Sequence, residues 1–341
     1  MKLNFDRKTA ALVLFSAAVV LLIANLVTSI IMNSTAVYTA KKEINNTEVD
    51  SLFLLSLHSF GISNDWIKEL KSKKSLKSYR VKVPTDLSIP VILVELNTNF
   101  QDNYVKIISE EKNFSGSTET KIYVGNQVRL KSKFNYDNEI HRPAGTISFV
   151  LKDFELNDSK DSLMLGIPES FSPLLLPSMR NFDISKFISE KKKTFSILLN
   201  DDISEIKYKL RDNYSENRIR STLYAIIRDF PSACFFVIDD NSDLYNSPSI
   251  KIIRNELLKR NIKLLKLREL SNIDYENDLQ LKKDFDNLIK NMVDGDSRII
   301  VINYEGFKKL IREIERFRKI GYKIVHPSQL IQEKTDKNNS N

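Results

Sequence analysis

The chain has 341 residues, and its 52 Lys and Arg residues against 44 Asp and Glu give a formal net charge of +8. The length suggests two domains, and because the positive excess is spread along the chain, it does not indicate a nucleic-acid binder. A single cysteine excludes an internal disulfide, and only three histidines are present, far apart in sequence, at His58, His141 and His326. A histidine-based metal cluster is therefore not expected.

An apolar segment near the N-terminus predicts a membrane anchor. Residues 9–32 contain no charged side chain, and a helix of this length can cross about 30 Å of hydrocarbon. Lys2, Arg7 and Lys8 precede the segment, so the positive-inside rule predicts a cytoplasmic segment over 1–8 and a periplasmic or other extracytoplasmic body. A cleaved signal peptide is the alternative, but its apolar region is usually about 7–15 residues long. We expect a single-pass protein that faces the cell envelope.

A small α+β domain is predicted over residues 51–143, after a polar stalk over 33–50. Apolar periodicity predicts helices over 51–62, 64–74 and 89–100, the second with Asn64 as its cap. Alternating and β-branched segments predict strands at 78–84, 104–111, 120–126 and 128–134. No motif in this domain indicates a chemical activity.

From residue 146 the sequence changes to short apolar strands separated by amphipathic helices. The predicted strands are 146–152, 162–167, 194–199, 233–238, 262–267, 298–303 and 322–326. Such alternation is typical of a parallel sheet covered by helices, either doubly wound or closed as a barrel. In both folds the functional site lies at the carboxyl ends of the strands. The polar tail over 332–341 is expected to be disordered.

Polar residues follow most of these predicted strands. They are Lys152, Asp153, Glu169, residues 200–202, residues 239–243, Arg268, Glu269 and residues 303–305. The run from Asp239 to Asp243 is similar to the start of a calcium loop, but Leu244 and Ile250 replace the glycine and glutamate that such a loop requires. An acidic turn that caps the next helix is the preferred interpretation.

Residues 146–331 resemble the divergent polysaccharide deacetylases of the YibQ type in the order and spacing of their segments. The segments that carry the resemblance are TISFVLKDFE (146–155), SLMLGIPES (162–170), SENRIRSTLYAIIRDFPSACFFVIDDNSD (215–243), NSPSIKIIRNELLKRNIKLL (246–265) and SRIIVINYEGFKKLIREIERFRKIGYKIVHPSQL (297–330). The resemblance covers a little over half of the chain. It implies an α/β fold of the distorted β/α barrel type and a role in carbohydrate metabolism at the cell envelope.

The resemblance also implies where a catalytic site would lie. Members of this family have a base aspartate followed by a metal-binding aspartate, and histidines complete the metal site. Lys152 stands at the position of the base and Asp153 at that of the metal aspartate, while Asp239 and Asn303 stand near the positions of the histidines. A cationic lysine cannot act as this base, and it repels a divalent ion bound beside it. We therefore expect a pseudoenzyme without a cofactor.

Three hypotheses follow for the function. The first is a degenerate deacetylase-like module that binds a glycan or a protein in a cleft formed by Asp153, Asp239, Asp240, Asn303 and Tyr304. The second is an active hydrolase with an unusual oxygen-ligand site for a divalent cation at Asp153 and Asp239. The third is an envelope interaction scaffold in which the 51–143 domain and basic helices over 203–230 and 303–319 bind a protein partner.

Overall fold

A computed structural model describes residues 44–71, 76–101, 104–112, 116–142, 145–156 and 163–339. The anchor expected over 9–32, the segment 1–8 and most of the stalk lie outside these residues. Within the described ranges no helix is both long enough and apolar enough to cross a membrane. The chain forms two compact units, the first with the described residues up to Leu57 and Asn64–Asn138, the second with His58–Ser63 and the residues from Glu139 onward.

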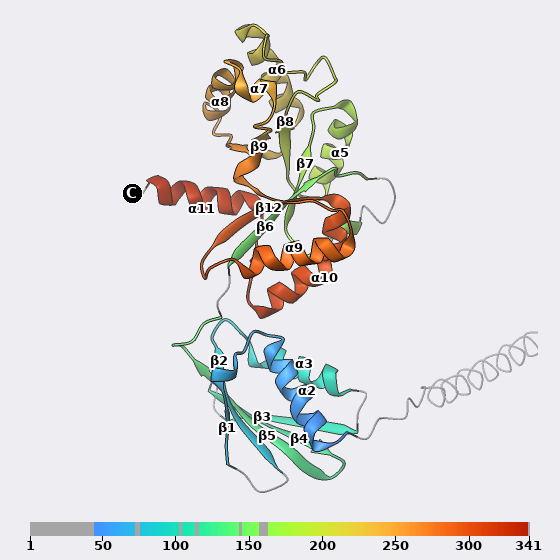
Figure 1. The fold of residues 1–341 in the computed structure, drawn as a ribbon, viewed down its shortest axis with the longest axis vertical. Helices are drawn as coiled ribbons and strands as arrows, with labels where there is room; N and C mark the ends of the chain where they lie inside the picture. The colour runs from blue at the N-terminus through green and yellow to red at the C-terminus, as the bar shows by residue number, and fades with distance from the viewer. Residues whose placement is uncertain are drawn as a thin grey trace, which may run out of the picture. The chain divides into compact units, whose positions relative to one another are not determined.

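The first unit is a five-stranded sheet with two helices, α2 (Asn46–His58) and α3 (Ile89–Phe100) (Figure 1). The strands, in their order across the sheet, are β1 (Ile67–Glu69), β2 (Lys77–Pro84), β5 (Gln127–Asp137), β4 (Ser117–Val124) and β3 (Val105–Glu111). β2 and β5 are parallel, and the other neighbours are antiparallel.

The helices cover one face of this sheet because alternate strand residues are apolar. Tyr79 on β2 and Phe134 on β5 are buried, and the Phe53 ring of α2 lies 5.4 Å and 6.3 Å from their rings. Asn99 on α3 donates a hydrogen bond to Ser56 on α2, at 2.8 Å, so the two helices lie side by side. The packed aromatic cluster supplies much of the apolar burial that stabilises the unit.

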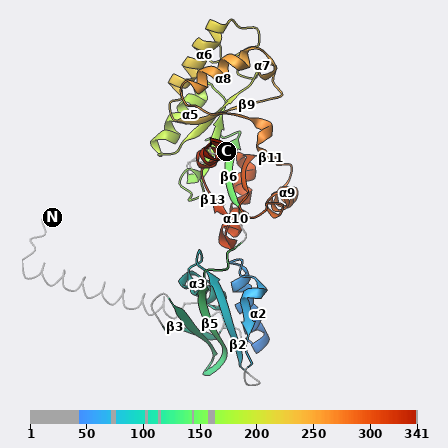
Figure 2. The same ribbon diagram turned by 90° about the vertical axis from the view of Figure 1, so that its left-hand side faces the viewer.

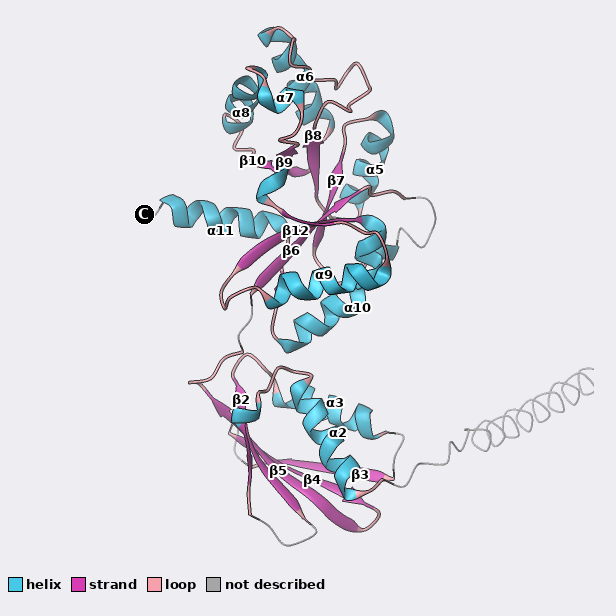
Figure 3. Ribbon diagram, in the orientation of Figure 1, coloured by secondary structure: helices cyan, strands magenta, loops and turns pink. Residues whose placement is uncertain are grey.

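The second unit is built on a parallel sheet (Figures 1 and 3). Its strands are β6 (Thr146–Lys152), β7 (Phe171–Leu175), β8 (Phe195–Leu199), β9 (Ala233–Ile238), β10 (Leu264–Lys266), β11 (Ser271–Ile273), β12 (Ser297–Asn303) and β13 (Lys323–Ile324). The order across the sheet is β10-β9-β8-β7-β6-β12-β11, and β13 pairs with the start of β6.

This strand order is that of a barrel that does not close. Each strand from β6 to β10 lies beside the next one in sequence, β11 lies beside β12, and β12 lies beside β6. Among the described strands, the one break is between β10 and β11, which do not pair. The short 3-10 turn η2 (Leu267–Glu269) joins these two strands. A distorted β/α barrel, as expected from the sequence, is therefore confirmed, and its open side lies between β10 and β11.

Helices follow most of the strands and pack against both faces of the sheet. They are α5 (Met179–Glu190), α6 (Glu216–Asp229), α7 (Asp243–Asn246), α8 (Ser249–Leu258), α9 (Asp278–Lys290), α10 (Tyr304–Ile320) and α11 (Pro327–Asn339). Phe149 of β6 belongs to the large cluster formed with α6, α8, α9 and α10. Its neighbour Val150 points to the opposite face, where it packs in a smaller cluster that includes Leu330 of α11. This face is not purely apolar, because it also buries Ser172 and Ser196, whose hydroxyl groups lie 3.1 Å apart.

Several sequence-based predictions are wrong in detail. Of the helix predicted over 64–74, the described residues 64–71 form a 3-10 turn, η1 (Asn64–Trp66), followed by β1, because pairing with β2 overrides the local helical pattern. The basic helix expected over 203–230 begins only at Glu216. The tail over 332–341 was expected to be disordered, but α11 continues as far as Asn339.

The largest error concerns the second barrel strand, predicted at 162–167. The described residues 163–166 of that segment form a helical turn, and the strand is β7 at Phe171–Leu175, which contains Pro173. A proline usually argues against an interior strand because it lacks an N–H group. Here β7 pairs with β6 through residues 171–173 and with β8 through residues 174–175, so Pro173 lies where the pairing changes partner.

Candidate functional site

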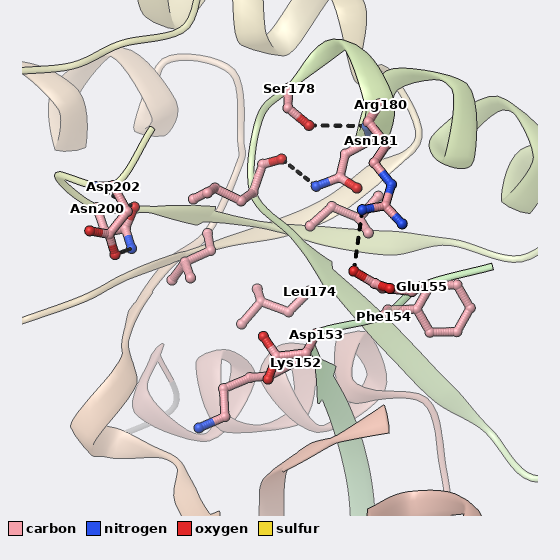
Figure 4. A pocket seen from close by; sticks show the side chains of 13 residues that line it. Lys152, Asp153, Phe154, Glu155, Leu174, Ser178, Arg180, Asn181, Asn200 and Asp202 are labelled. Atoms are coloured by element: carbon pink, nitrogen blue, oxygen red, sulfur yellow. Dashed lines mark hydrogen bonds and ion pairs between the residues drawn. The ribbon is translucent and has the colours of Figure 1, made fainter. Parts of the chain in front are cut away.

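A pocket of about 400 Å³ lies at the carboxyl ends of β6, β7 and β8. Its polar lining comes from three segments: Lys152, Asp153 and Glu155 after β6, Ser178, Arg180 and Asn181 at the start of α5, and Asn200 and Asp202 after β8. Figure 4 shows these three groups surrounding the pocket from different sides. The apolar floor includes Leu174 and Leu198. The pocket is therefore at the strand ends, where the sequence pattern predicts the functional site.

The end of β6 and the residues after it contribute one cation, Lys152, and two anions, Asp153 and Glu155. The Lys152 Nζ atom donates a hydrogen bond to the side-chain oxygen of Asn272, at 3.0 Å, and lies 3.8 Å from the Asp274 carboxylate. Asp153 is exposed and has a φ angle of 53°, in the left-handed region that few residues other than glycine adopt. The next residue, Phe154, is buried with its ring 4.9 Å from that of Tyr304. This sharp turn buries Phe154 and leaves the carboxylate of Asp153 at the pocket.

The N-terminus of α5 contributes the second group. Ser178 caps the helix by accepting a hydrogen bond from the N–H of Asn181, at 3.1 Å, and the Asn181 amide donates to the carbonyl of Leu176, at 2.7 Å. Arg180 is 62% exposed and forms an ion pair of 3.3 Å with Glu155. The cap fixes the direction of the helix, and the guanidinium of Arg180 remains accessible at the pocket.

The end of β8 contributes a rigid amide. Asn200 is 6% exposed, its side-chain nitrogen donates to Asp202 at 2.8 Å, and its oxygen accepts from the N–H of Asp202 at 3.1 Å. The neighbouring Asp201 accepts hydrogen bonds from the N–H groups of Asp243 and Leu244, at 2.6 Å and 3.2 Å. Asp201 therefore stabilises the start of α7 and has no part in the pocket lining.

The expected cleft residues Asp239 and Asp240 have structural roles and do not line this pocket. The Asp239 carboxylate accepts a hydrogen bond from the N–H of Asn241, at 3.0 Å, which forms a local turn. Asp240 is 9% exposed, and its two oxygens bind the N–H group and the side chain of Arg268, at 2.9 Å and 3.2 Å. These contacts are those of the acidic turn that the sequence favours over a calcium loop.

Asn303 and Tyr304 likewise lie outside the pocket lining. The side-chain oxygen of Asn303 accepts a hydrogen bond from the N–H of Gly306, at 2.8 Å, and so caps α10. Tyr304 is 2% exposed and packs in the main apolar cluster. Glu169, predicted to follow a strand, instead precedes β7, and its buried carboxylate forms an ion pair of 2.9 Å with Arg318.

The residues present do not fit the divalent metal that the family resemblance implies. Asp239 is already bound to a main-chain N–H group, and the residue before Asp153 is a cation. In the part of the chain that the structure describes, no three His, Cys, Asp or Glu side chains form a group that could hold a metal ion. A zinc site of the usual kind needs three or four such ligands. The pocket is consequently one of polar donors and acceptors without a metal-ligand set.

Sequence reasoning missed Ser178, Arg180 and Asn181 as pocket residues. The misplaced second strand concealed them, because the strand end was taken to lie near Glu169. A usable signal exists in the sequence, since Ser178 has the residue type of an N-cap and follows Pro177 directly after a run of three leucines. That signal indicates a helix start immediately after a strand.

No family model matches the chain, and no curated protein matches it. Similar solved structures include a CE4 family pseudoenzyme from Bacillus anthracis, at 11% identity over 63% of this chain and 83% of that chain, with a TM-score of 0.35. Another is a peptidoglycan N-acetylglucosamine deacetylase, at 14% identity over 55% and 89% of the two chains, with a TM-score of 0.37. A third is an uncharacterized protein from Agrobacterium tumefaciens, at 12% identity over 56% and 90%, with a TM-score of 0.37.

Proposed function

We propose that the second unit is a deacetylase-like domain that binds a saccharide at the strand-end pocket without hydrolysing it. The supporting observation is which polar side chains bond to the protein itself and which ones line the pocket. Asp239 and Asp240 are bound to the protein's own N–H groups, whereas Asp153 and Arg180 line a pocket of about 400 Å³. Sugar hydroxyl groups both donate and accept hydrogen bonds, so a pocket with cationic donors and carboxylate acceptors suits them.

The chemistry of the β6 end supports the proposal that the pocket does not hydrolyse its ligand. Deacetylation requires a polarised carbonyl and an activated water molecule, which a metal and a base normally supply. Lys152 occupies the position that the resemblance assigns to the base, and it donates its hydrogen bond to Asn272. A donor in this position cannot take a proton from water while it remains a cation.

Calorimetric titration of the full-length protein with N-acetylglucosamine oligomers tests the proposal. We expect saturable binding with no release of acetate. The Arg180→Ala substitution should weaken binding about tenfold, because it removes a charged hydrogen-bond donor. Lys283→Ala, which removes an exposed lysine of α9 outside the pocket, is the matched control and should bind like the parent protein. Acetate release would contradict the proposal, and so would equal binding by the Arg180→Ala variant.

We further propose that the protein is a single-pass membrane protein whose two units face the cell envelope. The support is the uncharged segment 9–32 and the basic residues Lys2, Arg7 and Lys8 before it. Membrane fractionation should recover the full-length protein in the membrane pellet after a high-salt wash. A variant without residues 1–43 should remain in the supernatant, and its recovery in the pellet would contradict the anchor.

A further inference from the structure

The sheet of the first unit ends in β3, an edge strand of seven residues (Figure 2). β3 pairs with β4 over its whole length, and no other strand among the described residues pairs with it. An edge strand presents a row of N–H and C=O groups to which another strand can bond. Edge strands are commonly protected by proline, by a bulge or by charged side chains. β3, with the sequence VKIISEE, contains no proline and no bulge in its pairing with β4, and its charged residues are of both signs.

The hydrogen bonds at the two ends of β3 show which residues point outward. Lys112 donates its N–H to the carbonyl of Ser117, at 2.8 Å, and the carbonyl of Tyr104 accepts from Gly125, at 3.4 Å. In an antiparallel pair, successive residues direct their main-chain groups to alternate sides. The even-numbered residues therefore bond to β4. Val105, Ile107 and Ser109 direct their N–H and C=O groups away from the sheet.

On one face of β3, a cationic, an apolar and an anionic side chain follow one another along the strand. Lys106, Ile108 and Glu110 are all exposed, and Ile108 is 42% exposed. On β4 these three residues lie opposite Tyr123, Lys121 and Glu119, in that order. Glu110 and Glu119 are thus like charges on neighbouring strands, and Lys112 lies 2.9 Å and 3.8 Å from them. A further cation on the open side of Glu110 would reduce this repulsion.

We propose that β3 pairs in antiparallel fashion with β3 of a second copy of the chain, about a two-fold axis at Ile108. This register pairs Ile107 with Ser109 of the other copy, so the outward-directed main-chain groups meet each other. It also pairs Ile108 with Ile108, and Lys106 with Glu110 on both sides of the axis. Each copy thereby supplies the cation that the Glu110 and Glu119 pair lacks on its open side.

Neighbouring registers are less favourable. A shift of two residues in one direction places Lys106 opposite Lys112, which is a like-charge pair. A shift of two residues in the other direction places Lys106 opposite Ile108. Lys106 of each copy then has no acidic partner across the two strands. Only the register centred on Ile108 pairs the whole of β3 with itself, and a closed two-fold contact of this kind has the same surface on both sides.

Cysteine cross-linking tests the register directly. In full-length protein with Cys234→Ser, so that no native thiol remains, Ile108→Cys should form a covalent dimer under mild oxidation. Side chains directly opposite in an antiparallel pair have Cβ atoms about 4.5–5.5 Å apart, within reach of a disulfide after a small adjustment. Lys121→Cys is the matched control, because it lies on the same face one strand inward. Its two copies would be three strand spacings apart, about 14 Å, and should not cross-link.

Charge exchange tests the same contact without a covalent bond. Sedimentation should show a concentration-dependent dimer for the parent protein, and Lys106→Glu or Glu110→Lys should each weaken it about tenfold by turning two attractive pairs into repulsive ones. The double variant should restore the parent affinity to within about threefold. Circular dichroism melting identifies any variant that fails to fold, and the cross-linking result then decides. A monomeric parent protein, equal cross-linking at positions 108 and 121, or a double variant as weak as the single ones would overturn the proposal.

Discussion

The side-chain nitrogen of Lys152 lies 3.0 Å from the side-chain oxygen of Asn272. Lys152 ends β6 and Asn272 lies on β11, and these two strands are on opposite sides of β12. The hydrogen bond therefore spans a strand and joins the start of the barrel to the edge of its open side. Lys152, which the sequence resemblance places at the position of a catalytic base, here links two strands of the barrel.

A double-mutant cycle should measure this bond. Lys152→Met keeps most of the apolar stem and removes the charge, while Asn272→Ala removes the acceptor. We expect a coupling free energy of about 1 kcal/mol in urea unfolding, because one partner is charged and the pair is partly exposed. A coupling near zero would show that the bond does not form in solution.

Asn303 should behave as a helix cap and not as a ligand of the saccharide. Its oxygen accepts the N–H of Gly306, at 2.8 Å. Asn303→Ala should therefore lower the free energy of unfolding by about 1 kcal/mol, whereas Asn303→Asp, which retains the acceptor, should lower it by less. Both variants should bind N-acetylglucosamine oligomers like the parent protein. Weaker binding by the aspartate variant at unchanged stability would instead place Asn303 in the binding site.

The sequence predicts the barrel better than the pocket, and the reason is physical. Strands such as β6 and β12 are continuous apolar runs, which parallel strands buried on both faces require. β7 does not follow this rule, because Pro173 lies inside it and only the change of pairing partner makes the proline acceptable. That one strand carries the chain to Ser178 and Arg180, so an error in its position removes a whole side of the pocket from the prediction.

For the acidic residues that follow strands, the sequence predicts their common role but does not identify the one that lines the pocket. Acids and amides after strands commonly cap helices and form turns, and Asp201, Asp239 and Asn303 do so. Asp153 follows a strand in the same way but lines the pocket. The difference depends on the burial of Phe154 and the left-handed turn before it, which local sequence patterns do not reveal.

Asp229 should make stability depend on pH in acid. Burial alone would raise the pKa of this carboxyl group, but hydrogen bonds from Arg228, Lys207 and Tyr208 outweigh burial and lower the pKa from 3.8 to about 2. The lowered pKa means that ionised Asp229 stabilises the folded state. This stabilisation is present above pH 3.8 and is lost as the pH falls from 3.8 to about 2. Asp229→Asn should remove that part of the acid dependence and lower stability near neutral pH by about 2 kcal/mol.

The matched control for this prediction is Glu216→Gln. Glu216 is 57% exposed and forms an ion pair with Arg220 one helical turn away. An exposed pair of this kind contributes about 0.3–0.5 kcal/mol, so the control should change stability little. Urea unfolding at several pH values compares the two variants. Equal effects of the two substitutions would show that the bonds to Asp229 add nothing beyond an exposed pair.

His326 should give a second pH dependence, nearer to neutrality. Burial, followed by the charge of Lys193, lowers the pKa of its ring below the usual 6.5, and the ring nitrogens lie 3.0 Å from Thr194 and 2.8 Å from Ser328. Protonation then favours the unfolded chain, so the stabilising effect is present above pH 6.5 and declines as the pH falls from 6.5 toward the folded pKa. His326→Gln should flatten this decline in urea unfolding. An unchanged slope would mean that the ring titrates equally in both states.

Metal analysis of the full-length protein, combined with zinc-dependent thermal unfolding, decides whether the strand-end pocket holds a metal ion. A ligand that binds the folded chain raises its stability by mass action. Because the pocket residues form no metal-ligand set, we expect no stoichiometric metal and no zinc-dependent increase in the melting temperature. Stoichiometric zinc that is lost in Asp153→Asn and in Asp239→Asn would contradict this expectation and would show a metal site at these two residues.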